Sequence, residues 1–267
     1  MSDRVTVNSV GGIADVRLNR ADKHNALDKE MFRSLTETGR RLAEDTSLRA
    51  VVLSGEGKSF CAGLDFASFM EMGEGAETGQ GLLAREQDRT ANVAQAPAYV
   101  WTELPVPVIA AIAGHCYGGG LQIALGADIR FVRPDARLSV MEIKWGLIPD
   151  MSGTQTLRHL VRADVAKELT YTGRIVSGTE AVELGLCTRL SEDPLRDALA
   201  MAHEIAGKSP DAIRSAKRVL NESRVLDVRS GLELEADLQS RLIGSPNQLE
   251  AIAANVEKRP PRFSDPG

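Results

Sequence analysis

Residues 109–128 read IAAIAGHCYGGGLQIALGAD, and the rest of the chain is organised around this stretch. An apolar run at 106–113 ends at Gly114, three consecutive glycines follow at 118–120, and a second apolar run occupies 121–127. This order predicts a strand, a tight glycine turn and a helix. The first N–H groups of a helix have no intrahelical partner and lie at the positive end of its dipole. The turn is therefore either a packing turn or a site where backbone donors face negative charge.

Strand and helix patterns alternate through residues 1–193 and predict an α/β core. Outside the central stretch, the expected strands are 5–8, 13–18, 50–53, 129–132, 137–140 and 186–190, and the expected helices are 28–44, 82–102, 151–160, 163–172 and 179–185. Pro97 is expected to end or kink the helix at 82–102, and Thr179 to cap the last one. Residues 66–81 lack a pattern and are expected to form a loop. Residues 194–267 predict helices alone, at 194–206, 210–222, 226–242 and 246–256.

Composition limits the classes of partner. The 267 residues carry a net charge of −5, which argues against a nucleic-acid-binding protein. With no signal peptide pattern and no apolar run of membrane-spanning length, we expect a cytoplasmic protein without a membrane partner. Three widely spaced cysteines and four scattered histidines give no disulfide framework and no metal-ligand spacing, so no metal site is expected.

A second glycine loop, SFCAGLD at 59–65, also follows an apolar strand. Two backbone N–H groups aimed at one oxygen form an oxyanion hole, which stabilises an enolate or a tetrahedral oxyanion. Two carboxyls, Glu142 and Asp150, lie in an apolar context in which a raised pKa would suit a base. From the residues alone, the favoured interpretations are a solvated strand-end residue for Glu142 and a helix cap for Asp150.

These motifs, in this order, resemble the crotonase (enoyl-CoA hydratase/isomerase) superfamily over nearly the whole chain. They are LNR at 18–20 with NAL at 25–27, SFCAGLD at 59–65, PVIAAI at 107–112 with the triple glycine, GLIP at 146–149 with GTQ at 153–155, and EKRPPRF at 257–263. The resemblance implies a spiral of ββα units with a helical C-terminal trimerisation region, and a homotrimer or hexamer. It also implies an acyl-CoA thioester substrate, with no cofactor beyond the CoA of that substrate.

By position, the resemblance makes the N–H groups of Leu64 and Gly119 the oxyanion-hole donors, with Glu142 and Asp150 as acid or base. It implies substrate-binding roles for Lys23, Asn25, Ala26, Ala62, Gly63, Asp65, Gly118, Gln122 and Lys258, the last as a contact to the CoA phosphate of a neighbouring chain.

The chain departs from the family pattern at Gln122, where the hydratases carry the first of two glutamates. A glutamine side chain cannot exchange a proton at neutral pH, although it can hold a water or a substrate oxygen. Asp150 matches an acid of the family's dienoyl-CoA isomerases. It also matches the nucleophile of its aryl-CoA dehalogenases, but these generally carry an aromatic residue at the position of Glu142. Isomerisation of an enoyl- or dienoyl-CoA is therefore the first hypothesis. The alternatives are a 2-enoyl-CoA hydratase that uses Glu142 alone and a non-catalytic acyl-CoA-binding protein.

Overall fold

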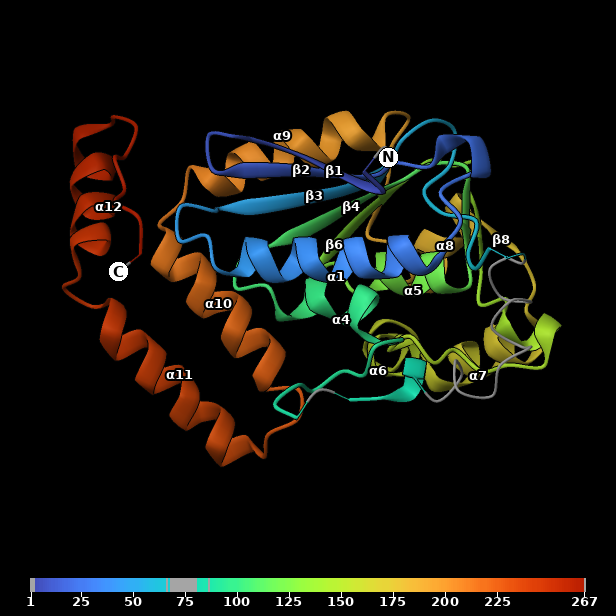
Figure 1. Cartoon of the computed structure of the whole chain (residues 1–267). Helices are drawn as coiled ribbons and strands as arrows, with labels where there is room; N and C mark the ends of the chain where they lie inside the picture. The colour runs from blue at the N-terminus through green and yellow to red at the C-terminus, as the bar shows by residue number, and fades with distance from the viewer. Residues whose placement is uncertain (1–2, 66, 68–80, 86, 267) are drawn as a thin grey trace.

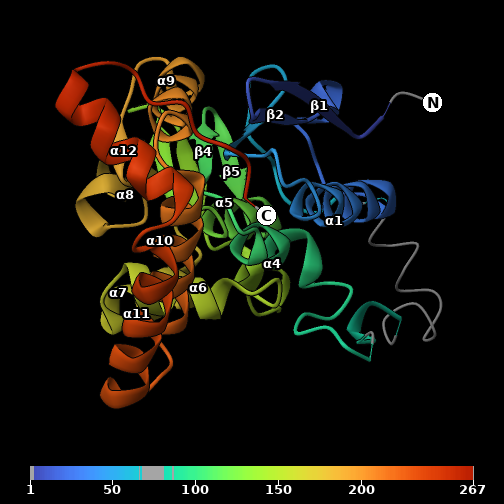
Figure 2. The ribbon, with the colours of Figure 1, turned by 90° about the vertical axis from the view of Figure 1, so that its left-hand side faces the viewer.

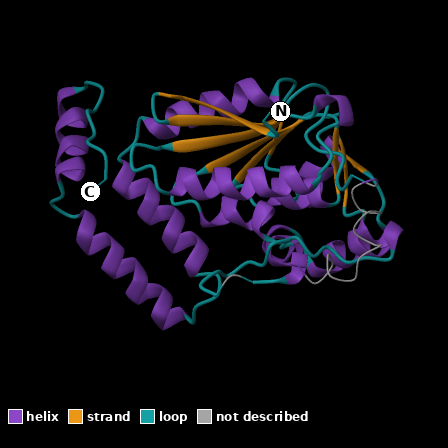
Figure 3. Cartoon of the chain, viewed as in Figure 1, coloured by secondary structure: helices purple, strands orange, loops and turns teal. Residues whose placement is uncertain are grey.

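The computed structural model describes residues 3–65, 67, 81–85 and 87–266. Within these ranges one sheet has six strands in the order β1-β2-β3-β4-β6-β9, and a smaller sheet has three in the order β5-β7-β8 (Figures 1 and 3). The larger sheet comprises β1 (Val5–Val10), β2 (Ile13–Leu18), β3 (Ala50–Gly55), β4 (Val108–Ile112), β6 (Ile129–Val132) and β9 (Arg189–Leu190). The smaller comprises β5 (His115–Tyr117), β7 (Arg137–Ser139) and β8 (Val176–Ser177). The predicted α/β class is confirmed.

Helices cover both faces of the larger sheet (Figure 1). Its strands run parallel from β2 onward, and only β1 pairs antiparallel, with β2. Alternate residues of β3 serve the two faces: Val51 and Leu53 join the cluster that includes side chains of α1 (Lys29–Ala43), whereas Val52 joins the cluster beneath α9 (Pro194–Ala206). A strand buried on both faces must be apolar throughout, which is why this stretch of sequence shows no alternation.

The remaining helices surround this core. They are η1 (Ala21–Lys23), α4 (Ala96–Glu103), α5 (Gly119–Leu125), η2 (Glu142–Trp145), α6 (Gly153–Leu160), α7 (Ala163–Thr172), α8 (Gly178–Leu184), α10 (Pro210–Glu222), α11 (Val228–Leu242) and α12 (Pro246–Glu257). The last three form an arm beside the sheet (Figure 2). The division of the chain at residue 193 stays a prediction. α9 follows that boundary in the sequence, yet it packs directly on β3 and β4 of the core.

Three predicted elements differ from the structure. The helix expected at 82–102 is wrong as drawn: α4 begins at Ala96, and Pro97 lies in its first turn, where its missing N–H has no cost. The chain does not pass from strand to helix in one turn, because β5 intervenes and joins the other sheet. Ser177, not Thr179, caps α8 by accepting a hydrogen bond from Glu180. The loop expected at 66–81 lies almost wholly outside the described residues.

Lys217 fastens the arm to the sheet core. Its Nζ, on α10, donates to the carbonyls of Trp101 and Val106 at 3.3 and 2.9 Å and pairs with Asp128 at 2.8 Å. The side chain is only 6% exposed. Burial lowers the pKa of Lys217, while the charge of Asp128 raises it.

Replacing Lys217 by Met should lower the free energy of unfolding by about 3 kcal/mol, because Asp128 and two carbonyls would lose their shared partner. Urea unfolding followed by circular dichroism measures the change. Arg218→Met on the same helix is the matched control: it breaks an exposed pair with Glu222 and should leave the free energy of unfolding almost unchanged, because exposed ion pairs contribute little to stability. Equal losses in both variants would contradict the role given to Lys217.

Candidate active site

The glycine loop at 59–65 and the triple-glycine turn at 118–120 lie side by side, with their backbones in close contact. Leu27 pairs with the loop at 59–65: its N–H donates to the carbonyl of Gly63 at 2.8 Å, and its carbonyl accepts from the N–H of Asp65 at 2.9 Å. Cys61 pairs in the same way with Cys116 of β5. At Gly120, an added Cβ would stand 2.6 Å from both the Cβ and the carbonyl oxygen of Cys61. Only glycine permits this approach.

The meeting of the loops leaves two N–H groups free. Within the described part of the chain, the N–H of Leu64 and that of Gly119, the first residue of α5, donate to no protein acceptor. The N–H of Gly118, in contrast, donates to Ser139 at 3.0 Å. A Cβ on Gly119 would lie 2.8 Å from Leu27 Cδ1 and 2.7 Å from Met151 Sδ, so these side chains flank the site. Both N–H groups are available to a ligand oxygen.

Glu142 lies beside this site in η2 and is buried. Its Oε1 accepts a hydrogen bond of 2.6 Å from Gln122 Nε2, and its Oε2 is buried without a hydrogen-bond partner among residues the structure describes. A Cβ on Gly118 would be 3.4 Å from Glu142 Oε1. Burial raises the pKa of Glu142, and the charge of Asp150 raises it further, while the bond from Gln122 lowers it. The interpretation of Glu142 as a solvated strand-end residue is wrong.

Asp150 lies in the turn between η2 and α6. The residue is exposed in the single chain, yet enough protein surrounds its carboxyl to raise the pKa of Asp150 by desolvation. Asp150 is not the cap of the next helix: α6 begins at Gly153, and its N-cap position is Ser152. Burial therefore raises the pKa of both carboxyls, and the charge of Asp150 acts on Glu142.

Several residues predicted to bind substrate are engaged within the protein. Asn25 is fully buried; its Nδ2 donates to the carbonyls of Glu56 and Ser59 at 3.0 and 2.8 Å, and its Oδ1 accepts from Arg20 N–H. Asp65 pairs with Arg20 at 2.6 Å. These bonds join the loop at 19–27 to residues 56–65, so a substrate contact by either side chain stays a prediction.

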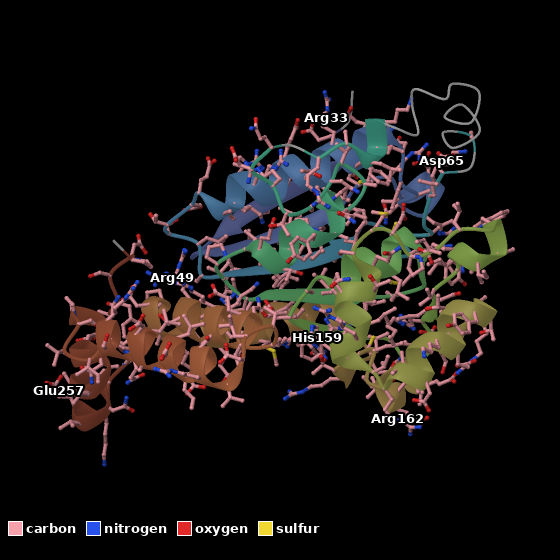
Figure 4. All side chains as sticks on the ribbon, turned by 90° about the horizontal axis from the view of Figure 1, so that it is seen from below. Arg33, Arg49, Asp65, His159, Arg162 and Glu257 are labelled. Atoms are coloured by element: carbon pink, nitrogen blue, oxygen red, sulfur yellow. The ribbon has the colours of Figure 1, made fainter. Side chains whose placement is uncertain are left out.

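The other predicted contacts fall into two groups. Lys23 is exposed at the end of η1, and Ala26, Ala62 and Gly63 lie along the junction of the two loops, where Ala62 N–H donates to His24 at 2.9 Å. Lys258 follows α12, which ends at Glu257, and Figure 4 shows Glu257 and Asp65 on opposite sides of the molecule. Lys258 is therefore remote from the loop at 59–65 of its own chain.

Among the described residues, no cluster of three His, Cys, Asp or Glu side chains is placed to hold a metal ion. None of the helices in that part of the chain has the length and apolar character to cross a bilayer.

Residues 8–266 match the family model described as Enoyl-CoA hydratase/isomerase. The chain belongs to this family. The mouse protein "Methylglutaconyl-CoA hydratase, mitochondrial" is 33% identical over 259 residues, covering 94% of this chain and 79% of that protein. The Arabidopsis thaliana protein "Delta(3,5)-Delta(2,4)-dienoyl-CoA isomerase, peroxisomal" is 32% identical over 262 residues, covering 96% and 94%.

The fold agrees with this membership of the enoyl-CoA hydratase/isomerase family. The crystal structure of enoyl-CoA hydratase from Bacillus anthracis superposes with a TM-score of 0.89 at 31% identity, covering 97% of this chain and 98% of that one. The predicted crotonase-like fold is confirmed. Family members act on acyl-CoA thioesters, so the substrate class expected from the motifs is confirmed as well.

Sequence reasoning missed Met151 and Arg20 in this family site. Met151 flanks Gly119 and donates its N–H to Gln122 Oε1 at 2.8 Å. Arg20 joins the loops by pairing with Asp65 and donating to the carbonyl of Ala26 at 3.1 Å. Arg20 belongs to the motif LNR and Met151 lies between the motifs GLIP and GTQ, but nothing in their spacing indicates these partners.

The raised pKa of Glu142 predicts a pH-dependent stability. The unfolded chain releases this proton near the ordinary value of 4.5, whereas the folded chain retains it to higher pH, so ionisation favours unfolding as the pH rises. Glu142→Gln should therefore gain stability relative to wild type from about pH 4.5 upward until folded Glu142 ionises. Urea unfolding at several pH values measures this difference. Glu233→Gln, at an exposed position on α11, controls for net charge. The same dependence of the free energy of unfolding on pH in both variants would refute the prediction.

Proposed function

We propose that this chain isomerises a double bond in an enoyl- or dienoyl-CoA thioester. The observation that supports this most is the buried Glu142 Oε2, which has no hydrogen-bond partner in the described structure and belongs to a carboxyl with a raised pKa. A base needs a free oxygen at the reacting carbon and a pKa close to the working pH. The second carboxyl, Asp150, supplies the proton that a double-bond shift must return.

The proposed reaction starts when Glu142 Oε2 takes a proton from an acyl carbon. The electron pair of the broken C–H bond moves into the conjugated system and onto the thioester oxygen, where the N–H groups of Leu64 and Gly119 stabilise the enolate. Asp150, which must carry a proton for this step, then gives that proton to a different carbon, and the double bond shifts. The proton on Glu142 returns to Asp150 through solvent, so the substrate changes neither composition nor charge.

Gln122 favours isomerisation over hydration. Its Oε1 accepts the N–H groups of Met151 and Gly153, both at 2.8 Å, and its Nε2 donates to Glu142. One amide hydrogen remains to orient a water, and no second carboxylate is present at this position to activate it. Hydration of a 2-enoyl-CoA with Glu142 as sole acid and base remains the second candidate, because relatives such as the mouse protein carry that activity in their names. A non-catalytic acyl-CoA-binding protein would not require a buried carboxyl oxygen without a partner.

An activity panel tests the proposal. Purified protein is given 2-enoyl-, 3-enoyl- and 3,5-dienoyl-CoA, and products are separated by chromatography. We expect isomerised products, with losses of roughly 10²- to 10⁴-fold in kcat for both Glu142→Gln and Asp150→Asn. Asp164→Asn, an exposed carboxyl on α7, should have wild-type activity. Conversion of 2-enoyl-CoA to 3-hydroxyacyl-CoA alone, unaffected by Asp150→Asn, would establish the hydratase. Tight binding of CoA esters without turnover would establish the binding protein.

The proposed enzyme is a homotrimer, or a hexamer of two trimers. Large apolar side chains are exposed along the arm, including Leu232 on α11 and Ile252 on α12, at 59% and 52%. Large apolar side chains exposed on successive helices favour a protein interface along the arm. Because Lys258 is remote from the loop at 59–65 of its own chain, we assign its proposed phosphate contact to the CoA bound by a neighbouring chain. CoA enters as part of the substrate, and no other cofactor is proposed; the cytoplasmic location stays a prediction.

Assembly through the arm should be sensitive to charge at its apolar surface. The double variant Leu232→Asp and Ile252→Asp is expected to elute as a monomer in size exclusion with light scattering, whereas wild type has at least three times the chain mass. Glu235→Ala, at an exposed position on α11, should assemble normally. A monomeric wild type, or a double variant that still assembles, would contradict this arrangement.

A further inference from the structure

Gln122 contacts both parts of the site that carry the carboxyls. It is 2% exposed and projects from the first turns of α5. On one side its Nε2 donates to Glu142 Oε1 at 2.6 Å. On the other its Oε1 accepts the N–H groups of Met151 and Gly153, which lie just beyond Asp150.

The turn that carries Asp150 depends on this contact. Ser152 has a φ of +66°, a left-handed conformation that is unfavourable for a residue with a side chain. Its Oγ is buried without a hydrogen-bond partner among residues 3–65, 67, 81–85 and 87–266. A Cβ on Gly153 would stand 2.6 Å from Gln122 Oε1. A turn with these features persists only where neighbouring groups hold it in place.

Gln122 also selects which oxygen of Glu142 can react. Oε1 accepts the amide hydrogen, whereas Oε2 has no hydrogen-bond partner among the described residues, so Oε2 is the oxygen better placed to accept a proton. A glutamate at position 122 would retain the acceptor for the turn but would lose the donor. A methionine would retain the size but would lose both. The side chain therefore has two separable functions.

From these contacts we infer that Gln122 is a positioning residue, which holds Glu142 and the Asp150 turn in a fixed relation and presents Glu142 Oε2 to the substrate. This inference deepens the proposed function and rests on it for the roles of the two carboxyls. It assigns to Gln122 no proton transfer and no substrate contact. The geometry of the turn can be measured without any turnover.

The first experiment measures amide hydrogen exchange at Met151 and Gly153, in wild type and in Gln122→Met. Loss of the acceptor should speed exchange at these two amides by about ten-fold or more, because their protection depends on local opening of the turn. Gln122→Glu should keep wild-type protection. Unchanged exchange in Gln122→Met would overturn the inference, whatever reaction the enzyme catalyses.

The second experiment measures kcat and KM for the substrate that the panel identifies. Gln122→Met should lose about a hundred-fold in kcat with little change in KM, since misplaced carboxyls affect the reaction more than binding. In Gln122→Glu, a second carboxyl would face Glu142 together with Asp150, the charged group that acts on it in the described structure. The acid limb of its kcat–pH profile should therefore move to higher pH.

Asn247→Leu is the matched control. This buried amide on α12 also makes three hydrogen bonds, to Asp211 and to the backbone of Ser264. Its loss should lower thermal stability but leave kcat and exchange at Met151 and Gly153 unchanged. An equal loss of kcat in Asn247→Leu and Gln122→Met would show that Gln122 acts only through stability and would overturn the inference. Faster exchange in a chain that catalyses no isomerisation would keep the turn-holding role and refute the proposed function alone.

Discussion

The closeness of two backbones at Gly120 and Cys61 determines the geometry of the site. The added-Cβ distance of 2.6 Å means that position 120 accepts a side chain only if the two backbones move apart. This contact sets where α5 begins, and thereby sets the direction of the Gly119 N–H. The next turn of α5 places Gln122, which in turn holds Glu142. The position of Gln122, and through it that of Glu142, therefore depends on the packing of two main chains.

The polar contacts then divide into those that build the loops and those left for a ligand. Asn25, Arg20 and Asp65 are used to fasten the loop that contains Leu64 to the loop that precedes Leu27. The N–H groups of Leu64 and Gly119 have no such use within the described residues. A preorganised donor pair has no reorganisation to undergo during reaction, which is the physical advantage of an oxyanion hole.

Sequence patterns predicted the arm best, because each of its helices carries its own boundary signals. The predicted 210–222 agrees with α10 (Pro210–Glu222), where Ser209 caps the helix and Pro210 begins it. The patterns failed at β5, since a strand of three residues between glycines has no periodicity to detect. For the site, the motifs identified Glu142 and Gln122 separately. Their contact spans 20 positions and follows from the path of β7 and η2, which local sequence does not encode. Asn25 stands in a motif that suggests ligand contact, yet its side chain faces inward.

The arm is fastened at both ends within the single chain. Lys217 holds α10 to the sheet core, and Asp265, beyond α12, returns to pair with Arg49 at 2.5 Å. Between these points α11 contacts chiefly α10. Its apolar side chains therefore lie on a segment that is attached to the core at both ends, rather than on a flexible tail. Ordering a flexible segment on association consumes binding free energy. A segment that is ordered in the single chain avoids most of that entropic cost, so even modest apolar contacts along α11 and α12 can yield a long-lived complex.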